Sequence, residues 1–298
     1  MTPTPRNQTP GLIAAAVGAS SLGLVTTGVR LAYDGGMSPA TLIAFRVAVG
    51  LCVTLGLALL LRRAVTLPRG ARLPALGVAT GSLMIAFGYM TSVYFIPVSL
   101  AALIFYLFPM IVLAISAATA RRMPGAVTMA AFATAFAGLA MALGPSLESL
   151  DWRGVALALV ATLGGTVFIL AGTRASRQMD AIVLIYFTQV VGLPIVATVM
   201  LFDGGPVMPT SRIGWTGLAV ATGAYVIGLV LQMVAVRLAD PAPVSMVSNL
   251  EPLVTLIIAA IVLGERLTAV QYAGCGLVLA AIVVAGRITV KTDGRSAS

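Results

Sequence analysis

The chain of 298 residues contains no histidine, two cysteines and only 9% charged residues. Without histidine it lacks the commonest metal ligand and the usual general base at neutral pH. Cys52 and Cys275 both lie in apolar stretches, so we predict packing roles for them and neither a disulfide nor a metal site. No phosphate-binding G-x-x-x-x-G-K-[ST] motif occurs, and the apolar stretches hold neither a Ser/His pair nor a pair of aspartates. These absences argue against ATP hydrolysis and against an enzyme, and we expect no cofactor and no metal.

Hydrophobic residues make up 59% of the chain, too many for a soluble domain of this size, whose surface needs more polar cover. A helix of about 20 apolar residues crosses the ~30 Å hydrocarbon core of a bilayer. The sequence therefore predicts ten membrane spans, with the least defined boundary near Pro97. The spans are residues 11–29, 39–61, 73–94, 98–120, 126–143, 152–172, 181–202, 213–236, 242–263 and 268–286.

The two halves of the chain repeat each other at an offset of 142 to 143 positions. Residues 37–50 (MSPATLIAFRVAVG) align with residues 179–192 (MDAIVLIYFTQVVG), and Pro109 aligns with Pro252. A repeat with an odd number of spans places its two copies in opposite orientations. We therefore predict an all-α integral membrane protein of ten helices, in which two inverted five-helix repeats surround a central cavity. The repeats comprise residues 1–147 and 148–298 and form one membrane domain.

The basic residues predict the orientation. With a cytoplasmic N-terminus, thirteen of the eighteen Lys and Arg residues fall on cytoplasmic segments and four fall outside, which matches the positive-inside rule. Trp152 and Trp215 then both lie at the outer interface, where amphipathic rings are favoured. We predict a multi-pass protein with both termini in the cytoplasm. The basic balance then reflects contact with anionic membrane lipids, and no nucleic-acid partner is expected.

Pro109 and Pro252 fall near the middle of spans four and nine. Proline removes one helical hydrogen bond and clashes with the preceding turn, so it should free the carbonyls of Phe105 and Ser248 and bend both helices. Matched bends in two inverted halves indicate hinges beside a central site. The alternative is that membrane helices simply tolerate proline at both positions.

Polar and aromatic residues gather around these prolines. Ser245, Ser248 and Asn249 share one face of span nine, and the repeat aligns them with Ala102, Phe105 and Tyr106 of span four. Polar side chains in a bilayer must face protein or water, although such residues often serve only as interhelical contacts of ~0.6 kcal/mol each. The predicted substrate-binding residues are Phe105, Tyr106, Tyr225, Gln232, Ser245, Ser248 and Asn249.

Glu251 and Arg46 are the two ionisable residues placed well inside the spans. Burying an isolated charge at this depth costs at least ~2.5 kcal/mol, so each needs a partner or a wet cavity. They could pair with each other, or Glu251 could carry a proton or meet an ammonium group. We predict that they are coupling or structural charges.

Two short segments carry a family resemblance. Residues 249–253 (NLEPL) followed by residues 263–268 (LGERLT) resemble the EamA-like branch of the drug/metabolite transporter superfamily, and the resemblance covers all ten spans. The first half departs from this pattern, since Arg121-Arg122 stands where the second half has Gly264-Glu265. The resemblance implies a ten-helix basket that exports small metabolites by alternating access. More narrowly, the chain is similar to YddG-type exporters of aromatic and other neutral amino acids.

We therefore expect a secondary transporter of a small-molecule substrate, foremost a neutral or aromatic amino acid. A phosphorylated sugar would lack the cationic partners that its phosphate needs in the predicted cavity. The same shortage means that helix dipoles or freed backbone groups would have to bind the carboxylate of an amino acid. Seventeen Arg against one Lys suits a bacterium of high G+C content and thus a cytoplasmic (inner) membrane. The alternatives are an exporter of other drugs or metabolites, a lipid- or quinone-handling enzyme, and a structural membrane subunit.

Overall fold

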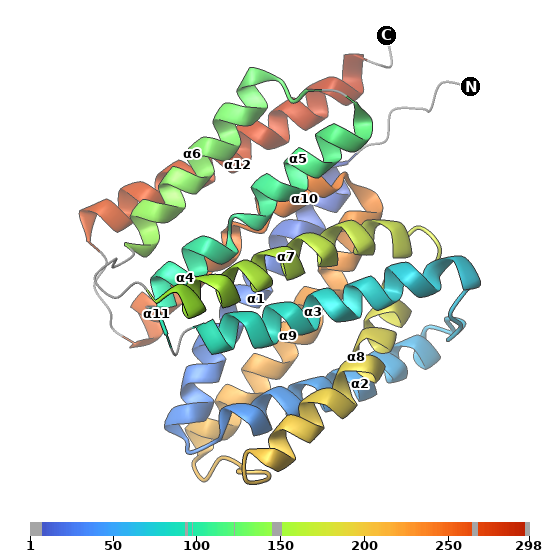
Figure 1. The fold of residues 1–298 in the computed structure, drawn as a ribbon, viewed down its shortest axis with the longest axis vertical. Coiled ribbons are helices and arrows are strands. Elements are labelled where there is room, and N and C mark those ends of the chain that lie inside the picture. The colour runs from blue at the N-terminus through green and yellow to red at the C-terminus, as the bar shows by residue number, and fades with distance from the viewer. Residues whose placement is uncertain are drawn as a thin grey trace.

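The computed structural model describes residues 8–92, 95–96, 98–121, 123–144, 151–263 and 268–295, and these residues form a helical protein (Figure 1). Nine stretches of the described chain are helical, long and apolar enough to cross a membrane, and the last helix adds a shorter apolar stretch, Ala269–Ala285. This agrees with an all-α protein of about nine or ten spans. The elements are α1 (Thr9–Asp34), α2 (Pro39–Leu60), the 3₁₀ turn η1 (Arg69–Ala71), α3 (Arg72–Ser92), α4 (Val98–Phe105), α5 (Phe108–Ala120), α6 (Ala126–Leu143), α7 (Trp152–Ala175), α8 (Ala181–Phe202), α9 (Arg212–Leu238), α10 (Pro241–Val247), α11 (Leu250–Leu263) and α12 (Ala269–Arg295).

Spans four and nine are each divided into two helices, α4 and α5 in the first half and α10 and α11 in the second. Each division lies just before the proline that the sequence marks, Pro109 or Pro252. Pro194 lies inside α8, which nevertheless continues unbroken. A proline alone is therefore not sufficient to divide a helix in this fold.

Polar side chains cap the starts of several helices. Ser38 precedes α2 and accepts a hydrogen bond from the backbone N–H of Thr41, which satisfies a donor that the first turn leaves unpaired. Asp151 caps α7 in the same way, accepting from the backbone N–H of Arg153. The Arg153 side chain also bonds this carboxylate, and the hydrogen bond lowers the pKa of Asp151. These caps fix where the two helices begin.

Helices α2 and α8 lie side by side and run antiparallel. Arg63, just after α2, forms an ion pair of 3.5 Å with Asp180, just before α8. At the other end of this pair, the Thr41 hydroxyl accepts a hydrogen bond from the backbone N–H of Val207, beyond the end of α8. Helices α6 and α12 likewise pack side by side at the opposite edge of the molecule (Figure 1).

Glycines let two further helix pairs approach backbone to backbone. An added Cβ at Gly28 of α1 would lie 2.6 Å from the backbone nitrogen of Ala221 in α9. An added Cβ at Gly81 of α3 would lie 2.7 Å from the carbonyl oxygen of Gly164 in α7. Real Cβ atoms do not approach so closely, so each seam requires glycine, as close helix packing in membranes often does. The sequence repeat aligns α1 with α7 and α3 with α9, so the pairs α1/α9 and α3/α7 are equivalent.

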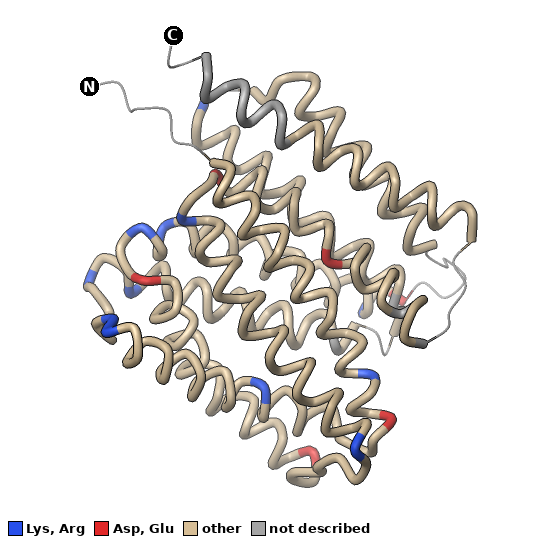
Figure 2. Tube along the Cα trace, turned by 180° about the vertical axis from the view of Figure 1, so that it is seen from behind, with Lys and Arg blue, Asp and Glu red and all other residues tan. Residues whose placement is uncertain are grey.

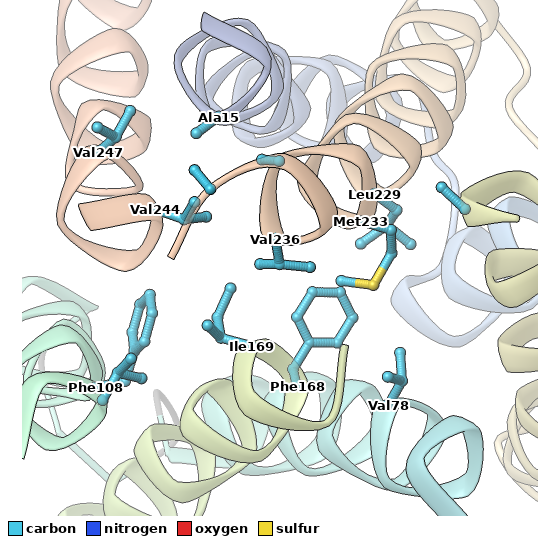
Figure 3. Packing of buried hydrophobic residues seen from close by; sticks show 14 of the residues in the cluster. Ala15, Val78, Phe108, Phe168, Ile169, Leu229, Met233, Val236, Val244 and Val247 are labelled. Carbon is cyan, nitrogen blue, oxygen red and sulfur yellow. The ribbon is translucent and has the colours of Figure 1, made fainter. Parts of the chain in front are cut away.

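Hydrophobic side chains fill the space between α3, α5, α7, α9 and α10 (Figure 3). Phe168 of α7 lies against Met233 of α9, and both are buried. Gly172 admits this contact, because an added Cβ there would lie 2.9 Å from the Met233 sulfur. Val78 and Phe108 extend the cluster toward α3 and α5. In this conformation, side chains close the centre of the bundle, where the sequence predicts a cavity.

The outer surface of the helices is apolar. Leu60, Leu73 and Phe202 are 77%, 79% and 89% exposed, as expected for side chains that contact lipid rather than water. Charged residues gather toward the ends of the helices (Figure 2). The described part of the chain is thus built as a multi-pass membrane protein.

Candidate functional site

The break between α4 and α5 is held by tight turns and by a side chain from another helix. The Leu107 N–H donates to the Ile104 carbonyl at 3.1 Å, a spacing of three residues that belongs to a 3₁₀ turn. Pro109 has no N–H to offer the carbonyl of Phe105. From α7, the Thr162 hydroxyl lies 2.8 Å from the Ile104 carbonyl and can donate to it. The end of α4 is therefore tied to α7 beside the break.

The break between α10 and α11 differs from the sequence expectation in one respect. The carbonyl of Ser248, expected to be freed by Pro252, accepts a hydrogen bond of 3.0 Å from the Glu251 N–H. A 3₁₀ turn thus satisfies this group, and the prediction of a free Ser248 carbonyl is wrong. The Asn249 N–H likewise donates to Met246 across three residues, at 3.1 Å. Unpaired side-chain groups also lie at this break.

Two amide oxygens near the second break are buried without a partner. The Gln232 amide on α9 donates to the Ser248 hydroxyl at 3.0 Å, but its own oxygen has no hydrogen bond. The Asn249 side-chain oxygen is also unpaired. Ser245 and Ser248 use their hydroxyl hydrogens on carbonyls of their own helix. Gln232 and Asn249 therefore present hydrogen-bond acceptors in a buried environment, where an unpaired group costs about 1–3 kcal/mol.

The two breaks meet through their side chains. Tyr106, between α4 and α5, and Glu251, at the start of α11, lie close enough for their side chains to interact electrostatically. Tyr89 of α3 lies close enough to interact electrostatically with the same carboxyl group. Aromatic rings line this region, with the Phe105 centroid 4.9 Å from that of Tyr106 and 5.9 Å from that of Tyr89. We define the hinge cluster as Phe105, Tyr106, Gln232, Ser245, Ser248, Asn249 and Glu251.

Arg46 lies elsewhere, in a second polar site where α2, α3, α8 and α9 meet. Its guanidinium carbon stands 4.1 Å from the ring centroid of Tyr225, a cation–π contact of about 0.5–2 kcal/mol. The Arg46 Nε–H has no hydrogen-bond partner. An ion pair with Glu251, one of the alternatives left open by the sequence, does not occur among the described residues. The two intramembrane charges thus have different neighbours.

This second site surrounds a pocket of about 20 Å³, which we call the mid-helix pocket. Arg46, Ser82, Thr188, Gln189 and Tyr225 contribute its polar groups. Gln189 is only 2% exposed, and its amide nitrogen has no hydrogen-bond acceptor. The pocket is large enough for one water-sized group. Two buried N–H donors, on Arg46 and Gln189, therefore border this space without a hydrogen bond to any protein group.

A larger groove of about 730 Å³ runs between α2 and α9 and is lined almost wholly by apolar side chains. Its lining includes the exposed residues Val53, Trp215 and Ile227, so it opens on the outer surface of the bundle. Such a surface offers little to orient a polar solute. The two interior polar sites are the better candidates.

The structure brings some of the predicted substrate-binding residues into contact. Gln232 and Ser248 are hydrogen-bonded, and the rings of Phe105 and Tyr106 pack together. Tyr225 lies apart from these contacts, in the mid-helix pocket with Arg46. Gln189 was missed, although a glutamine inside an apolar span is a signal that could have identified it. The segment 264–267, part of the motif used for the family resemblance, lies outside the described residues.

The long apolar helices and the buried polar sites define a multi-pass membrane protein. A family model matches the chain twice, over residues 9–144 and 152–287, and the chain belongs to the EamA-like transporter family. It is therefore a membrane transporter of small molecules. A solved structure titled only "Crystal structure of protein" is similar in fold, with a TM-score of 0.77 and 19% sequence identity over 94% of this chain and 98% of that one. A comparison with curated proteins gives no match.

Proposed function

We propose that this protein exports small metabolites, foremost neutral or aromatic amino acids, by alternating access across a bacterial cytoplasmic membrane. The observation that carries the proposal is the proximity of Tyr106 and Glu251, whose side chains interact electrostatically between two broken helices from the two halves of the chain. Broken helices at equivalent places in two halves are a feature of transporters that bind substrate between their repeats. Movement at one break is then communicated directly to the other.

The packing of equivalent helices supports an inverted relation between residues 1–147 and 148–298. Helices α2 and α8 are equivalent in the repeat and lie antiparallel, as the Arg63–Asp180 ion pair and the Thr41–Val207 hydrogen bond require. Two copies of one unit in opposite orientations can exchange conformations across the membrane. Alternating access is then the rearrangement of one half into the shape of the other.

The hydrophobic cluster around Phe168 and Met233 acts as the closed barrier in this account. It separates the hinge cluster from the mid-helix pocket, since Leu229 of the same cluster lies between Gln232 and Tyr225 along α9. The side chains come from helices of both halves (Figure 3). Bending at Pro109 and Pro252 would part these helices and open the centre to one side at a time.

The hinge cluster offers groups suited to a neutral amino acid. The unpaired oxygens of Gln232 and Asn249 can accept hydrogen bonds from an amino group. The rings of Phe105 and Tyr106 can pack an apolar or aromatic side chain. Ser245 and Ser248 complete the wall through α10. We keep Tyr225 as a substrate contact, in the mid-helix pocket.

Both termini are proposed to lie in the cytoplasm. Arg62, Arg63, Arg69 and Arg72 cluster between α2 and α3, and an added Cβ at Gly70 would clash with Gln178 between α7 and α8. The arginines at 174 and 177 therefore lie at the same end of the bundle. A concentration of positive charge at one end is the pattern that faces the cytoplasm.

Export by intact cells tests the substrate class. Bacteria that express the protein would be fed dipeptides, which release amino acids inside the cell, and the amino acids appearing in the medium would be measured. We expect faster release of phenylalanine, leucine or similar amino acids than from cells that express the Pro252→Ala variant. Release of phosphorylated sugars or lipids with no change for any amino acid would contradict the proposal.

A further inference from the structure

We propose that the mid-helix pocket binds the carboxylate group of the transported solute, through the guanidinium group of Arg46 and the side-chain amide of Gln189. This inference rests on the transporter function proposed above and names a part of its substrate. It assigns a ligand to a pocket that lies apart from the hinge cluster.

Unpaired donors carry the inference. The Nε–H of Arg46 and the side-chain NH₂ group of Gln189 are both buried, and neither has an acceptor. Buried polar groups in proteins are almost always paired, so an unpaired group calls for an explanation. Two such donors on one pocket are available to acceptor atoms of a ligand. A carboxylate has two oxygens that accept only, which matches this pair of donors.

The charge of Arg46 points to an anion rather than to a neutral acceptor. Within the described residues Arg46 forms no ion pair, and its guanidinium group rests on the Tyr225 ring alone. The ring stabilises the cation but occupies one face of its plane, which leaves the N–H groups at the plane's edge for a ligand. An arginine edge and a carboxylate fit each other in a fork-like geometry.

The pocket also has the position expected of a transport site. Ser82 is the central residue of α3 and Tyr225 is the central residue of α9, so the pocket lies halfway along these helices. In the sequence repeat Arg46 is equivalent to Thr188 and Leu83 to Tyr225, and all four side chains line the pocket. Each half therefore contributes equivalent positions to one point halfway along the helices, the depth at which repeat transporters bind their solutes.

Gly50 keeps the amide of Gln189 in place. Gly50 lies one helical turn beyond Arg46 on α2, and an added Cβ there would stand 2.6 Å from the Gln189 amide nitrogen. The glycine thus makes room for a donor that serves no other group in the fold. The pocket's volume of about 20 Å³ is smaller than a whole solute, so the surrounding helices must separate during loading.

The substrate-binding residues predicted from the sequence include no cation for the carboxylate of an amino acid. Arg46 supplies that cation. It contacts Tyr225, which lies some two helical turns from Gln232 on α9. The spacing of about 10 Å is too great for one α-amino acid to reach both sites with its amino and carboxylate groups. An α-amino acid therefore places its carboxylate in the mid-helix pocket at one stage of transport and contacts the hinge cluster at another. A longer solute could contact both sites at once.

The test compares acids with their amides on the purified protein in detergent. The thermal unfolding midpoint would be measured with each of the common L-amino acids, with benzoate and acetate, and with the matching amides. The key variant is Gln189→Glu, which places a carboxylate of the protein's own beside Arg46. The matched control is Gln271→Glu, the same change at a half-buried position in the first turn of α12, where a carboxylate can still accept the hydrogen bond from the Thr268 N–H. Arg46→Gln is the second variant, which removes the cation.

We expect at least one carboxylate to raise the midpoint of the wild type and its amide to raise it little or not at all. Gln189→Glu should fold, because its new charge is paired, and should lose this response. Arg46→Gln should bind the acid at least about tenfold more weakly, the loss typical of a hydrogen bond to a charged group. Gln271→Glu should respond like the wild type.

The inference is overturned if no carboxylate shifts the wild type, if acids and amides act equally, or if Gln189→Glu keeps the full response. Its failure can be told apart from failure of the proposed function. Discrimination of acids from amides without amino acid export by cells leaves the pocket assignment standing and removes the amino acid substrate. Amino acid export by cells without discrimination of acids from amides leaves the proposed function standing and removes the pocket assignment.

Discussion

The hydroxyl group of Tyr106 and the carboxyl group of Glu251 lie close enough to interact electrostatically, although 145 positions separate them in the sequence. Tyr106 lies in the break of one half and Glu251 at the break of the other. A carboxylate near the middle of a membrane is costly unless it is paired or protonated. This interaction therefore couples the two hinges, because the distance between Tyr106 and Glu251 depends on the relative position of the two breaks.

The Glu251→Gln variant removes the charge and nearly preserves the shape. We expect solute exchange to slow about tenfold, which is about 1.4 kcal/mol on the barrier, because the interaction of the Glu251 carboxyl group with Tyr106 is lost. We also expect the pH dependence of exchange to flatten, since a glutamine cannot take up a proton. Tyr106→Phe, which keeps the charge and removes the donor, should slow exchange and retain the pH dependence. A Glu251→Gln variant with the wild-type rate and pH profile would exclude both a coupling and a hinge role.

The Pro252→Ala variant tests the second hinge. Alanine restores a backbone N–H, which allows the helix to continue through the break. We expect exchange to slow at least about tenfold, which is about 1.4 kcal/mol on the barrier, while the yield of folded protein is unchanged. Pro194→Ala is the matched control, because Pro194 lies in a continuous helix. Equal rates for the two variants would show that the break does not serve as a hinge.

The Gly81→Val variant tests the seam between α3 and α7. Its Cβ would meet the Gly164 carbonyl oxygen at 2.7 Å, so the helices must move apart. We expect a loss of about 1–3 kcal/mol in stability, the usual cost of overpacking, seen as a lower thermal unfolding midpoint in detergent. Gly56→Val should unfold like the wild type, because an added Cβ at Gly56 meets nothing within 4 Å.

Cysteine labelling in cells tests the orientation. In a background with Cys52 and Cys275 replaced by alanine, Asp203→Cys in the α8–α9 loop should react with a membrane-impermeant maleimide from outside. Met123→Cys, 87% exposed between α5 and α6, should react only after the membrane is permeabilised. The opposite pattern would reverse the topology. Labelling of both sites from outside would contradict a membrane arrangement of this kind.

Local signals made much of the fold predictable. Apolar length fixed most helix boundaries to within a few residues, and the aligned prolines predicted where two spans divide. The positions of the prolines do not predict which hydrogen bonds replace the lost ones. The 3₁₀ turn at Ser248 depends on how the helices on both sides of it pack in the folded protein. Pro194 shows the same limit, since an identical residue leaves α8 intact.

The pairing of polar side chains could not be predicted in the same way. Arg46 and Glu251 stood out as buried charges, but their neighbours depend on which helices touch. The structure gives Arg46 to Tyr225 and Gln189, and Glu251 to Tyr106. Gln189 carried a weak signal, because its equivalent in the first half is the apolar Val47. Only the packing of four helices around the pocket shows that its amide is unpaired and lies beside Arg46.

Counterflow in vesicles that contain only the purified protein tests the central claim, transport by alternating access, most directly. Vesicles would be loaded with an unlabelled amino acid and diluted into a trace of the same labelled compound, without ATP. A carrier that exposes one site to each side in turn should accumulate label transiently, several-fold above empty vesicles, and Pro252→Ala should accumulate it more slowly than Pro194→Ala. If label enters no faster when the vesicles are preloaded, for every amino acid and other metabolite tried, the protein does not work by alternating access.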